Sequence, residues 1–428
     1  MIRRRRALET RDMPLTWPYL TSEIPAIAAS IRRRLEDFQV DELPAYDPCG
    51  SGDHVYVRIE KAGLTTRQAI LDVARALEIP PSTVGAAGRK DARGVTRQIL
   101  SVEGVEPSRV RALDLPRIRI LDVARHRAKL RLGSLLGNRF TIRLREVSTG
   151  RIGELQEVLR VLAGRGVPNY FGPQRFGMRG DTWEIGRSLV AADFASAVAL
   201  IVGRPAAGDP ASVGQARALA AAGHHGEAAN AWPKGFADCA RLCRSLERTH
   251  GDSQRAIFRL DRSVLSFYVS AYQAWLFNRV LAERLAGLDR ILPGDIAFSH
   301  RTGLCALVAD PSAEQARAAR FEISPTGPIV GFAMPAPQDE AGRIERTILA
   351  EIGCDVEGLP RSGPLRCVGG RRSFRFSMEG VGTDSGADRA GAYLELRFTL
   401  PPGSYATAVL REICKDRLRD GPADPVEE

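Results

Sequence analysis

Three segments that lie far apart in the chain alternate apolar and polar residues as half-buried strands do. They read HVYVRIE at 54–60, RFTIRLR at 139–145 and YLELRFTL at 393–400. Successive side chains of a strand point to opposite faces of the sheet, so each segment offers one face to a core and one to solvent. All three are therefore predicted to be strands.

The chain between the first two strands predicts a helix. Thr65 and Thr66 precede RQAILDVARALEI, and threonine is a favourable N-cap residue. The two prolines at 80–81 prevent the helix from continuing. Apolar residues at helical spacing are predicted to form its buried face: Ile70, Val73, Ala74 and Leu77.

A glycine-rich basic stretch, GAAGRKDARGVTRQ at 85–98, follows that helix and resembles a phosphate-binding loop. A P-loop requires Ser or Thr after its lysine, because the hydroxyl holds the magnesium ion. Here Asp91 follows Lys90, and an aspartate would repel a triphosphate. Two readings remain for Asp91 from the residues alone: a helix cap or solvated turn, or a catalytic residue in a loop before the predicted strand QILSV at 98–102.

Later segments differ in composition. Residues 195–230 are alanine-rich and predicted helical, and 263–285 predict a buried helix in which Phe267, Ala271 and Leu276 belong to a wide apolar stripe. Glycines and prolines at 292–345 and 358–386 predict loop-rich segments. A turn at PPGSYAT leads into a helix predicted to begin near Ala408.

Composition restricts the class of protein. A net charge of +10 and 61 basic residues favour a polyanionic partner such as nucleic acid. The cysteines are odd in number and form no CxxC pair, and Cys239 and Cys243 alone do not make a zinc site, so neither disulfides nor metal are expected. No transmembrane span or export signal is predicted, and Arg3–Arg6 read as a solvated or RNA-contacting tail.

The distinctive stretches, taken in order, resemble the TruD-type tRNA pseudouridine synthases. Besides residues 85–98, the matching segments include EDFQV at 36–40, RHRAKLRLGSLLGNRFTIRLR at 125–145, GVPNYFGPQRFG at 166–177 and LRFTLPPGSYATAVLREI at 396–413. The combination of KDxxxxTxQ with NYFGxQRFG is specific to that family. The resemblance spans residues 17 to 413.

The resemblance implies an α+β fold with a mixed, mainly antiparallel sheet flanked by helices. It implies a catalytic domain in two parts, 1–194 and 376–428, separated by a large family-specific α/β insertion at 195–375. It also implies a cytoplasmic isomerase that converts uridine to pseudouridine in tRNA, at position 13 of the D arm. No cofactor, nucleotide or metal is implied, no membrane partner is expected, and the oligomeric state stays open with a monomer favoured.

The family's catalytic aspartate corresponds to Asp91. A carboxylate there could attack C1′ as a nucleophile or remove the C2′ proton as a base, and the sequence does not choose between the two. Both routes need an ionised carboxylate, which a nearby cation favours. The family motif assigns that cation to Arg32, although Arg33 and Arg34 are adjacent and Leu35 replaces the usual proline. Lys90 is the competing candidate, but neighbouring side chains of an extended chain point apart.

The flipped base needs aromatic faces and an amide to hold it. The family's pocket positions correspond to Phe38, Asn169, Phe171 and Tyr405. An aromatic residue taken alone is more often a core residue, and the joint match of these positions to the motifs favours the pocket instead. A basic run and Lys90 are possible contacts to the RNA backbone: Lys90, Arg125, Arg127, Lys129 and Arg131. His126 is expected to be structural or to face phosphate. Thr96 and Gln98 are expected to brace the loop, whose glycines let the chain approach the nucleotide.

Two departures from the family pattern affect RNA fit rather than catalysis. Ala26, Ala28 and Ala29 replace a glycine-rich turn at 25–30, and Asp181 stands where asparagine is usual and RNA could pass. The leading hypothesis is a tRNA uridine isomerase. The alternatives are the same enzyme acting mainly on another RNA, or a non-catalytic RNA-binding protein that keeps the fold.

Overall fold

The protein is described by a computed structural model over residues 16–206 and 208–421. The chain divides into two compact units: unit 1 is Met1–Pro18 with Tyr170–Phe374, and unit 2 is Tyr19–Asn169 with Arg375–Glu428. The predicted N-terminal arginine tail and the last residues of the predicted polar C-terminal tail lie outside the described ranges. Each unit has its own secondary structure and core, and the two are described separately.

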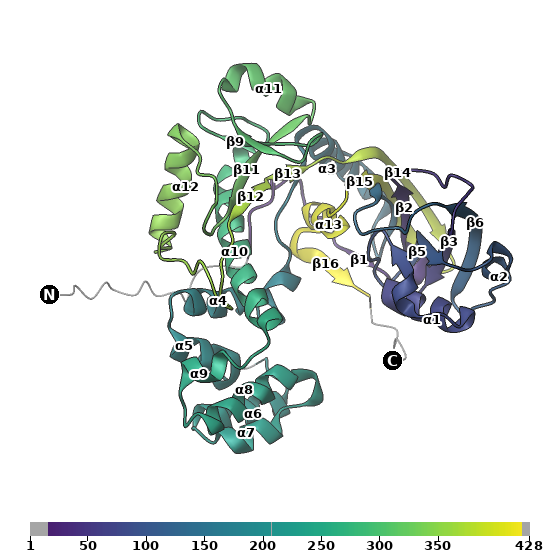
Figure 1. The fold of residues 1–428 in the computed structure, drawn as a ribbon. Coiled ribbons are helices and arrows are strands. Elements are labelled where there is room, and N and C mark those ends of the chain that lie inside the picture. The colour runs from purple at the N-terminus through teal and green to yellow at the C-terminus, as the bar shows by residue number, and fades with distance from the viewer. Residues whose placement is uncertain (1–15, 207, 422–428) are drawn as a thin grey trace. The chain divides into compact units, whose positions relative to one another are not determined.

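Unit 2 is built on a large, mainly antiparallel sheet (Figure 1). Its central strands follow the order β14-β15-β7-β2-β5-β3-β6, with β4 paired to β5 and with β1 paired to β7 and β16. Only β2–β5 and β1–β16 pair in parallel within the described sheet. The strands are β1 (Ala29–Ile31), β2 (Phe38–Pro44), β3 (His54–Ala62), β4 (Val84–Ala86), β5 (Val95–Glu103), β6 (Ile118–His126), β7 (Leu135–Arg145), β14 (Glu379–Asp388), β15 (Gly391–Leu400) and β16 (Leu418–Asp420).

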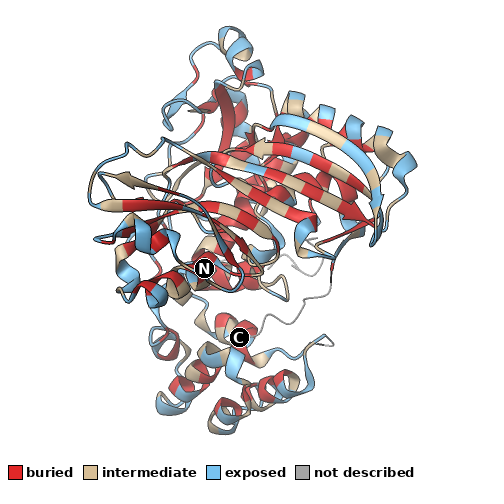
Figure 2. Cartoon of the chain, turned by 90° about the vertical axis from the view of Figure 1, so that its right-hand side faces the viewer, coloured by how far each residue is buried: buried red, intermediate tan, exposed pale blue. Residues whose placement is uncertain are grey.

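The three strands predicted from alternation are confirmed as β3, β7 and β15. In β15 every second residue from Leu394 to Leu400 is buried, and the alternation of buried with more exposed positions is visible along the strands in Figure 2. β3 departs from it, because Tyr56 is buried on the opposite face from Val55 and Val57. A sheet of mainly antiparallel strands with helices confirms the α+β fold.

Helices cover this sheet and complete two cores. α3 (Ile152–Arg165) and α13 (Ala406–Cys414) pack on β7, β2 and β15, while α1 (Thr66–Leu77) packs on β3 and β5. The predicted helix is confirmed as α1: Thr65 is its N-cap and accepts a hydrogen bond from the Gln68 amide. The short elements of unit 2 are α2 (Pro107–Arg111), β8 (Val167–Pro168) and β13 (Arg375–Phe376).

Unit 1 combines helices with a second sheet of four strands in the order β10-β9-β11-β12. The long helix α10 (Arg262–Arg284) is largely buried, and the predicted helix is confirmed there. Gly186 of α4 (Thr182–Val190) lets the two helices meet closely, since a Cβ there would lie 2.1 Å from the Tyr268 carbonyl oxygen. The Trp183 and Trp275 rings stack with centroids 4.1 Å apart.

The remaining elements of unit 1 are α5 (Phe194–Val198), α6 (Ala211–Ala221), α7 (His225–Ala231), α8 (Ala237–Arg248), α9 (Ser253–Ile257), α11 (Pro311–Ala319), α12 (Asp339–Glu351), β9 (Ile296–Ser299), β10 (Cys305–Leu307), β11 (Ile323–Ile329) and β12 (Gly370–Ser373). The helical prediction for 195–230 is confirmed by the helices α5 to α7. All seven cysteines are free thiols. Within the described ranges, no helix is both long and apolar enough to cross a membrane.

Several expectations for unit 1 differ from the structure. The loop-rich prediction for 292–345 is wrong, because β9, β10, α11, β11 and most of α12 lie there. β11 contains Pro325 and Pro328, which normally disfavour a central strand. Phe267, expected in the apolar stripe of α10, is 39% exposed. The insertion at 195–375 stays a prediction; the compact unit that contains it also includes α4, which packs on α10.

Candidate active site

Asp91 lies in the loop between β4 and β5, and its backbone is held from two sides. The amide of Lys90 donates to Thr66 Oγ1 (2.7 Å), which in turn donates to Gln98 Oε1 (2.9 Å). The Asp91 carbonyl oxygen accepts from Lys61 Nζ (3.1 Å). Gln98 therefore braces the loop as expected, whereas the buried Thr96 hydroxyl has no hydrogen-bond partner among the described residues. The Asp91 carboxylate itself is 75% exposed, so the fixed backbone presents it to solvent.

Lys61, at the end of β3, is fully buried beneath this loop. Its ammonium also donates to the Leu64 carbonyl at 2.5 Å. Burial lowers the pKa of Lys61 to about 8, although the nearby Asp91 carboxylate opposes that shift. Lys61 thus ties the start of α1 to the Asp91 backbone.

The Lys90 side chain is buried against β2. It is 5% exposed, and its Nζ lies 2.5 Å from Glu42 Oε2, so the ammonium is engaged inside the protein. The other Glu42 oxygen accepts from the Ile99 amide (3.1 Å). The side chains of Lys90 and Asp91 point apart, as extended geometry requires, and Lys90 is not the partner of Asp91.

The glycines of the loop serve close packing. A Cβ at Gly94 would lie 2.4 Å from the Phe38 carbonyl oxygen, and one at Gly85 would lie 2.5 Å from that of Leu130. Neither has a positive φ, so sterics rather than backbone freedom require glycine there. Ala87 packs with Tyr56 and Leu130 on the same side of the sheet.

Arg32 faces Asp91, as the motif match predicted. Its Nη2 lies 3.6 Å from Asp91 Oδ2, and its guanidinium is centred 4.2 Å above the Phe38 ring. The Arg32 backbone has φ = 54°, a region that costs a non-glycine residue roughly 1–2 kcal/mol. An ion pair with one exposed partner contributes at most about 1 kcal/mol, so the pair stabilises the fold little.

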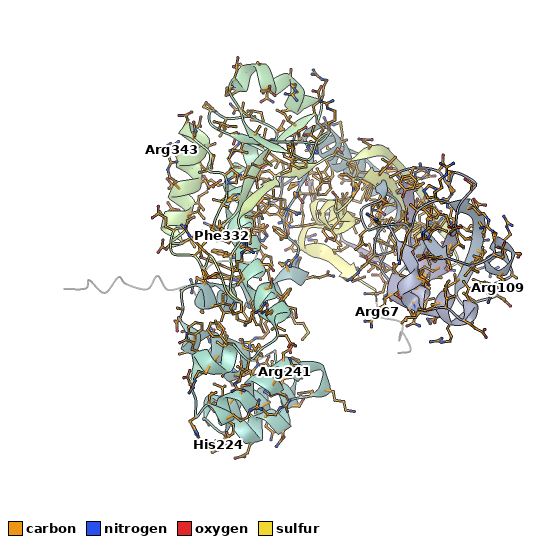
Figure 3. The ribbon with its side chains drawn as sticks, in the orientation of Figure 1. Arg67, Arg109, His224, Arg241, Phe332 and Arg343 are labelled. Carbon is orange, nitrogen blue, oxygen red and sulfur yellow. The ribbon has the colours of Figure 1, made fainter. Side chains whose placement is uncertain are left out.

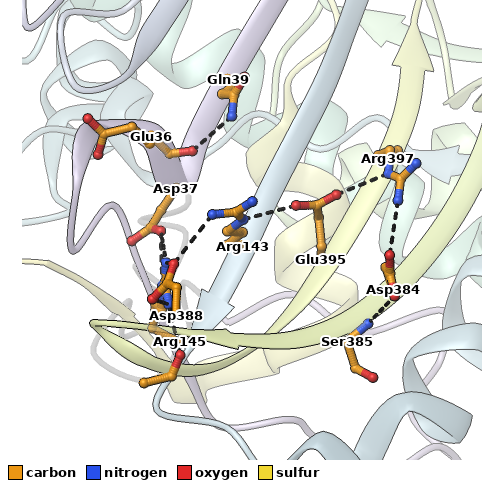
Figure 4. A network of polar contacts seen from close by, with 11 residues as sticks. Glu36, Asp37, Gln39, Arg143, Arg145, Asp384, Ser385, Asp388, Glu395 and Arg397 are labelled. Carbon is orange, nitrogen blue, oxygen red and sulfur yellow. Dashed lines mark hydrogen bonds and ion pairs between the residues drawn. The ribbon is translucent and has the colours of Figure 1, made fainter.

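The turn from Arg32 to Phe38 is anchored by a polar network (Figure 4). Asp37 accepts from buried Arg145 at 2.6 and 2.9 Å and also accepts from the Arg34 amide. Arg145 in turn donates to Asp388 (2.7 Å); these bonds raise the pKa of the Arg145 guanidinium and lower that of the Asp388 carboxyl. The network fixes the turn that carries Arg32.

Phe38 is 3% exposed, with one face against Arg32 and its edge region near Phe140. In this conformation the ring supports Arg32 and offers no free face, contrary to the expected stacking role. Tyr405 differs: it is 65% exposed just before α13, and among the described residues no hydrogen bond or ring contact ties it to Asp91 or Arg32. Its ring is free to stack.

The NYFG motif is divided between the units. Asn169 follows β8 at the end of the first segment of unit 2, and Phe171 belongs to unit 1. The Phe171 backbone is held by Asn278 of α10, whose side chain accepts from its amide (2.9 Å) and donates to its carbonyl (3.0 Å). The Arg372 guanidinium lies 4.3 Å from the Phe171 ring centre.

The basic run differs from residue to residue. Arg127 and Arg131 are exposed, as are Arg67 and Arg109 on α1 and α2 in Figure 3. Arg125 pairs with Glu106 (2.8 Å), and Lys129 donates to the Ser82 carbonyl. The His126 ring packs against Tyr46 and Tyr56 and accepts from the Cys49 amide, which confirms the expected structural role.

The Asp91 and Arg32 ion pair is thus one part of a loop and turn fixed by the surrounding strands. A family model described as tRNA pseudouridine synthase D (TruD) matches residues 15–413. The chain belongs to the TruD family. This confirms the resemblance, and the match includes the loop that carries Asp91.

Relatives in the TruD family cover nearly the full length. The tRNA pseudouridine synthase D of Geobacter metallireducens is 43% identical over 397 residues, covering 93% of this chain and 97% of its own. That of Geobacter sulfurreducens is 43% identical over 402 residues, with coverages of 93% and 96%. A solved structure from Methanosarcina mazei, assigned as a TruD protein, is 26% identical with a TM-score of 0.83, covering 94% of this chain and 96% of its own.

Four residues around the TruD motifs were missed by sequence reasoning: Lys61, Glu42, Asn278 and Asp420. Each lies in an ordinary strand or helix pattern. Glu42 and Lys61 fall inside the segments 17–46 and 50–69, which also resemble the family, whereas Asn278 and Asp420 fall in none of the matching segments. The sequence feature that could have drawn attention to Glu42 and Lys61 is a charged side chain on the buried face of a strand, where charged residues are rare.

The two departures from the TruD pattern have simple structural outcomes. Ala26, Ala28 and Ala29 have negative φ, so this chain follows its path through 25–30 without glycine. Asp181 lies next to α4 and pairs with Arg179 at 3.4 Å, which offsets its charge. Among residues 16–206 and 208–421, no group of three or more His, Cys, Asp or Glu side chains could hold a metal ion.

Proposed function

We propose that this chain isomerises a uridine of tRNA to pseudouridine, with the Asp91 carboxylate acting at the ribose. Membership of the TruD family supports the reaction. The observation that carries the residue assignment is an exposed carboxylate on an immobilised backbone, 3.6 Å from a guanidinium. A reactive acid needs access to substrate and a fixed position, and Asp91 has both.

The reaction rearranges bonds within one nucleotide. The N1–C1′ bond breaks, the uracil turns, and a C5–C1′ bond forms while C5 loses its proton and N1 gains one. The atoms and electrons balance without an oxidant or reductant. Asp91 would form a transient bond to C1′ or remove the C2′ proton, and both routes use the ionised carboxylate.

Arg32 is proposed to orient that carboxylate. The guanidinium can donate to Asp91 through one nitrogen while its plane rests on Phe38. The rigid turn at 34–37, held by Arg145, limits the positions that Arg32 can take. Phe38 is thus a positioning residue in this proposal.

Asn169, Phe171 and Tyr405 remain proposed contacts for the flipped base. The exposed Tyr405 ring supports stacking, which contributes about 1–3 kcal/mol per base. The Phe171 backbone is fixed by Asn278, which supports a defined ring position. Uridine 13 of the D arm is the proposed target within tRNA, and the cytoplasm is the proposed compartment.

The test measures pseudouridine directly. The full chain is incubated with tRNA from a strain lacking this activity, and pseudouridine is mapped by carbodiimide modification and primer extension. We expect one new stop at position 13 for the unaltered chain and none for Asp91→Asn. Asp47→Asn serves as a control, because it removes another exposed aspartate charge from the same unit.

Each result has a clear meaning. A stop that persists with Asp91→Asn would contradict the assignment of the catalytic residue. A stop only at another position, or only in another RNA, would replace the target. Absence of any stop with the folded, unaltered chain would leave the non-catalytic RNA-binding hypothesis in its place.

A further inference from the structure

The last described strand places a carboxylate between two arginines of the candidate active site. β16 runs parallel to β1, and Asp420 Oδ2 lies 3.3 Å from Arg32 Nη1 and 2.9 Å from Arg93 Nη1. Arg32 simultaneously faces Asp91, and Arg93 is two residues beyond Asp91 in the same loop. One acid therefore bridges Arg32, which faces the proposed catalytic carboxylate, and Arg93, which belongs to the same loop.

The backbone fixes this arrangement. The Gly421 amide donates to the Ile31 carbonyl (2.8 Å), and the Gly421 carbonyl accepts from Arg93 Nη2. A Cβ at Gly421 would lie 2.7 Å from the Arg32 carbonyl oxygen, so glycine permits the close approach. The carboxylate of Asp420 is nonetheless 45% exposed, and another anion could reach the same guanidiniums.

A phosphodiester has the charge and the oxygen atoms needed to replace the Asp420 carboxylate between Arg32 and Arg93. It carries one negative charge on two terminal oxygens, and guanidinium groups bind such oxygens as they bind a carboxylate. Every ribose inside an RNA chain is flanked by a phosphate on each side. A carboxylate that acts at C1′ must therefore work within one nucleotide of a phosphate.

A phosphate bound at this position would displace Asp420. A phosphodiester held by Arg32 and Arg93 would lie beside the Asp420 carboxylate, and like charges at such distances repel. Moving Asp420 away leaves the phosphate as the anion that Arg32 and Arg93 share. Arg32 can bind the phosphate and still face Asp91, because the nitrogen that faces Asp91 is not the one that faces Asp420.

We infer that Arg32 and Arg93 form a binding site for one phosphodiester of the substrate RNA, and that Asp420 occupies its place in the free protein. This inference rests on the proposed function, because it takes RNA as the substrate. Asp420 keeps the two guanidiniums converged before RNA arrives, and the phosphate displaces it.

The test is equilibrium binding of unmodified tRNA at several salt concentrations, with all proteins carrying Asp91→Asn so that no conversion occurs. We expect Asp420→Asn to tighten binding roughly three- to tenfold and to steepen the slope of log K against log salt by about one, because one more cation becomes available to phosphate. Arg93→Gln should weaken binding and flatten the slope by a similar amount.

Glu146→Gln is the matched control. Glu146 also lies between two arginines of unit 2, Arg33 (3.2 Å) and Arg419 (3.1 Å), but neither arginine contacts Asp91. Its change should stay within about twofold, as expected for a screened surface charge. If both variants bind tRNA more tightly by the same factor, the change in affinity comes from long-range charge and not from a phosphate site. If Asp420→Asn binds tRNA more weakly, Asp420 only holds the two arginines in place. Either result overturns the inference.

A parallel assay separates this inference from the proposed function. Pseudouridine formation by the chain with Asp91 intact is measured on the same tRNA. If pseudouridine forms while the Asp420 result fails, only the phosphate site is wrong. If no pseudouridine forms and tRNA does not bind, the proposed function fails first.

Discussion

At the scale of single residues, Arg32 is distinguished by its contacts rather than by its place in a run of arginines. It alone of the three contacts Asp91, while Arg33 pairs with Glu146 and Arg34 with Glu36. Sequence left these neighbours as alternatives, since adjacent arginines have the same chemistry. The backbone turn at φ = 54° separates them by pointing Arg32 toward the loop.

We expect Arg32→Lys to reduce the rate constant of pseudouridine formation at least tenfold. A lysine has a single nitrogen, so it cannot face Asp91 with one nitrogen, bind a second anion with another and rest flat on Phe38. The rate is measured in single turnover by tritium released from C5-labelled uridine. Arg33→Lys is the control, and its rate constant should stay within about twofold of that of the unaltered chain. An equal loss in both variants would mean that the arginine run 32–34 acts together and that Arg32 has no special role.

Lys61 predicts a pH dependence of stability. Its pKa of about 8 in the folded chain lies below the ordinary value of 10.5, so the unfolded state binds more protons between these values. Stability contributed by this group therefore rises as pH increases from 8 toward 10.5, by up to roughly 3 kcal/mol. Between pH 8 and 10, the thermal midpoint of the unaltered chain should rise relative to that of Lys61→Met. A constant or shrinking difference would contradict the buried, easily deprotonated ammonium.

At the scale of elements, the candidate site is assembled where β2, β5 and the β4–β5 loop meet. The parallel pairing of β2 with β5 brings Glu42 beneath Lys90, and β16 beside β1 brings Asp420 to Arg32. Each pairing joins segments that are distant in sequence. The loop conformation therefore depends on the packing of whole strands.

Gly94→Ala tests that packing. A Cβ 2.4 Å from a backbone oxygen cannot be accommodated without shifting the start of β5 from β2. We expect a loss of about 1–3 kcal/mol in stability and a larger loss of activity, because Asp91 moves with the strand. Gly153→Ala in α3 is the control, since its Cβ would meet open space and alanine favours helix. Normal activity of Gly94→Ala would show that the loop tolerates the shift.

At the scale of the whole molecule, the excess of ten positive charges predicts how RNA binds. Many of the arginines of unit 2 are paired with acids, and exposed groups such as Arg67, Arg127 and Arg131 remain for phosphate. We expect tRNA affinity to fall steeply as salt rises from 50 to 200 mM, roughly tenfold or more for a few phosphate contacts. The measurement is filter binding at fixed pH; an affinity independent of salt would exclude this surface from RNA recognition.

The sequence by itself determined the local pieces and their chemistry. Alternation marked β3, β7 and β15, an N-cap and apolar spacing marked α1, and the KD motif marked the loop of Asp91. These features depend on residues within one or two turns or strands, where periodicity reports directly which face is buried. The family motifs added Arg32 as the partner.

Only the tertiary structure decided which partners those pieces met. It buried Lys90 against Glu42, covered Phe38 with Arg32, left Phe267 exposed and brought Asp420 to the candidate site from 388 residues away. It also made a strand of β11 despite its prolines. Periodicity predicts that one face of an element is buried, but it does not predict which segment covers that face. Long-range pairing depends on how the whole chain packs.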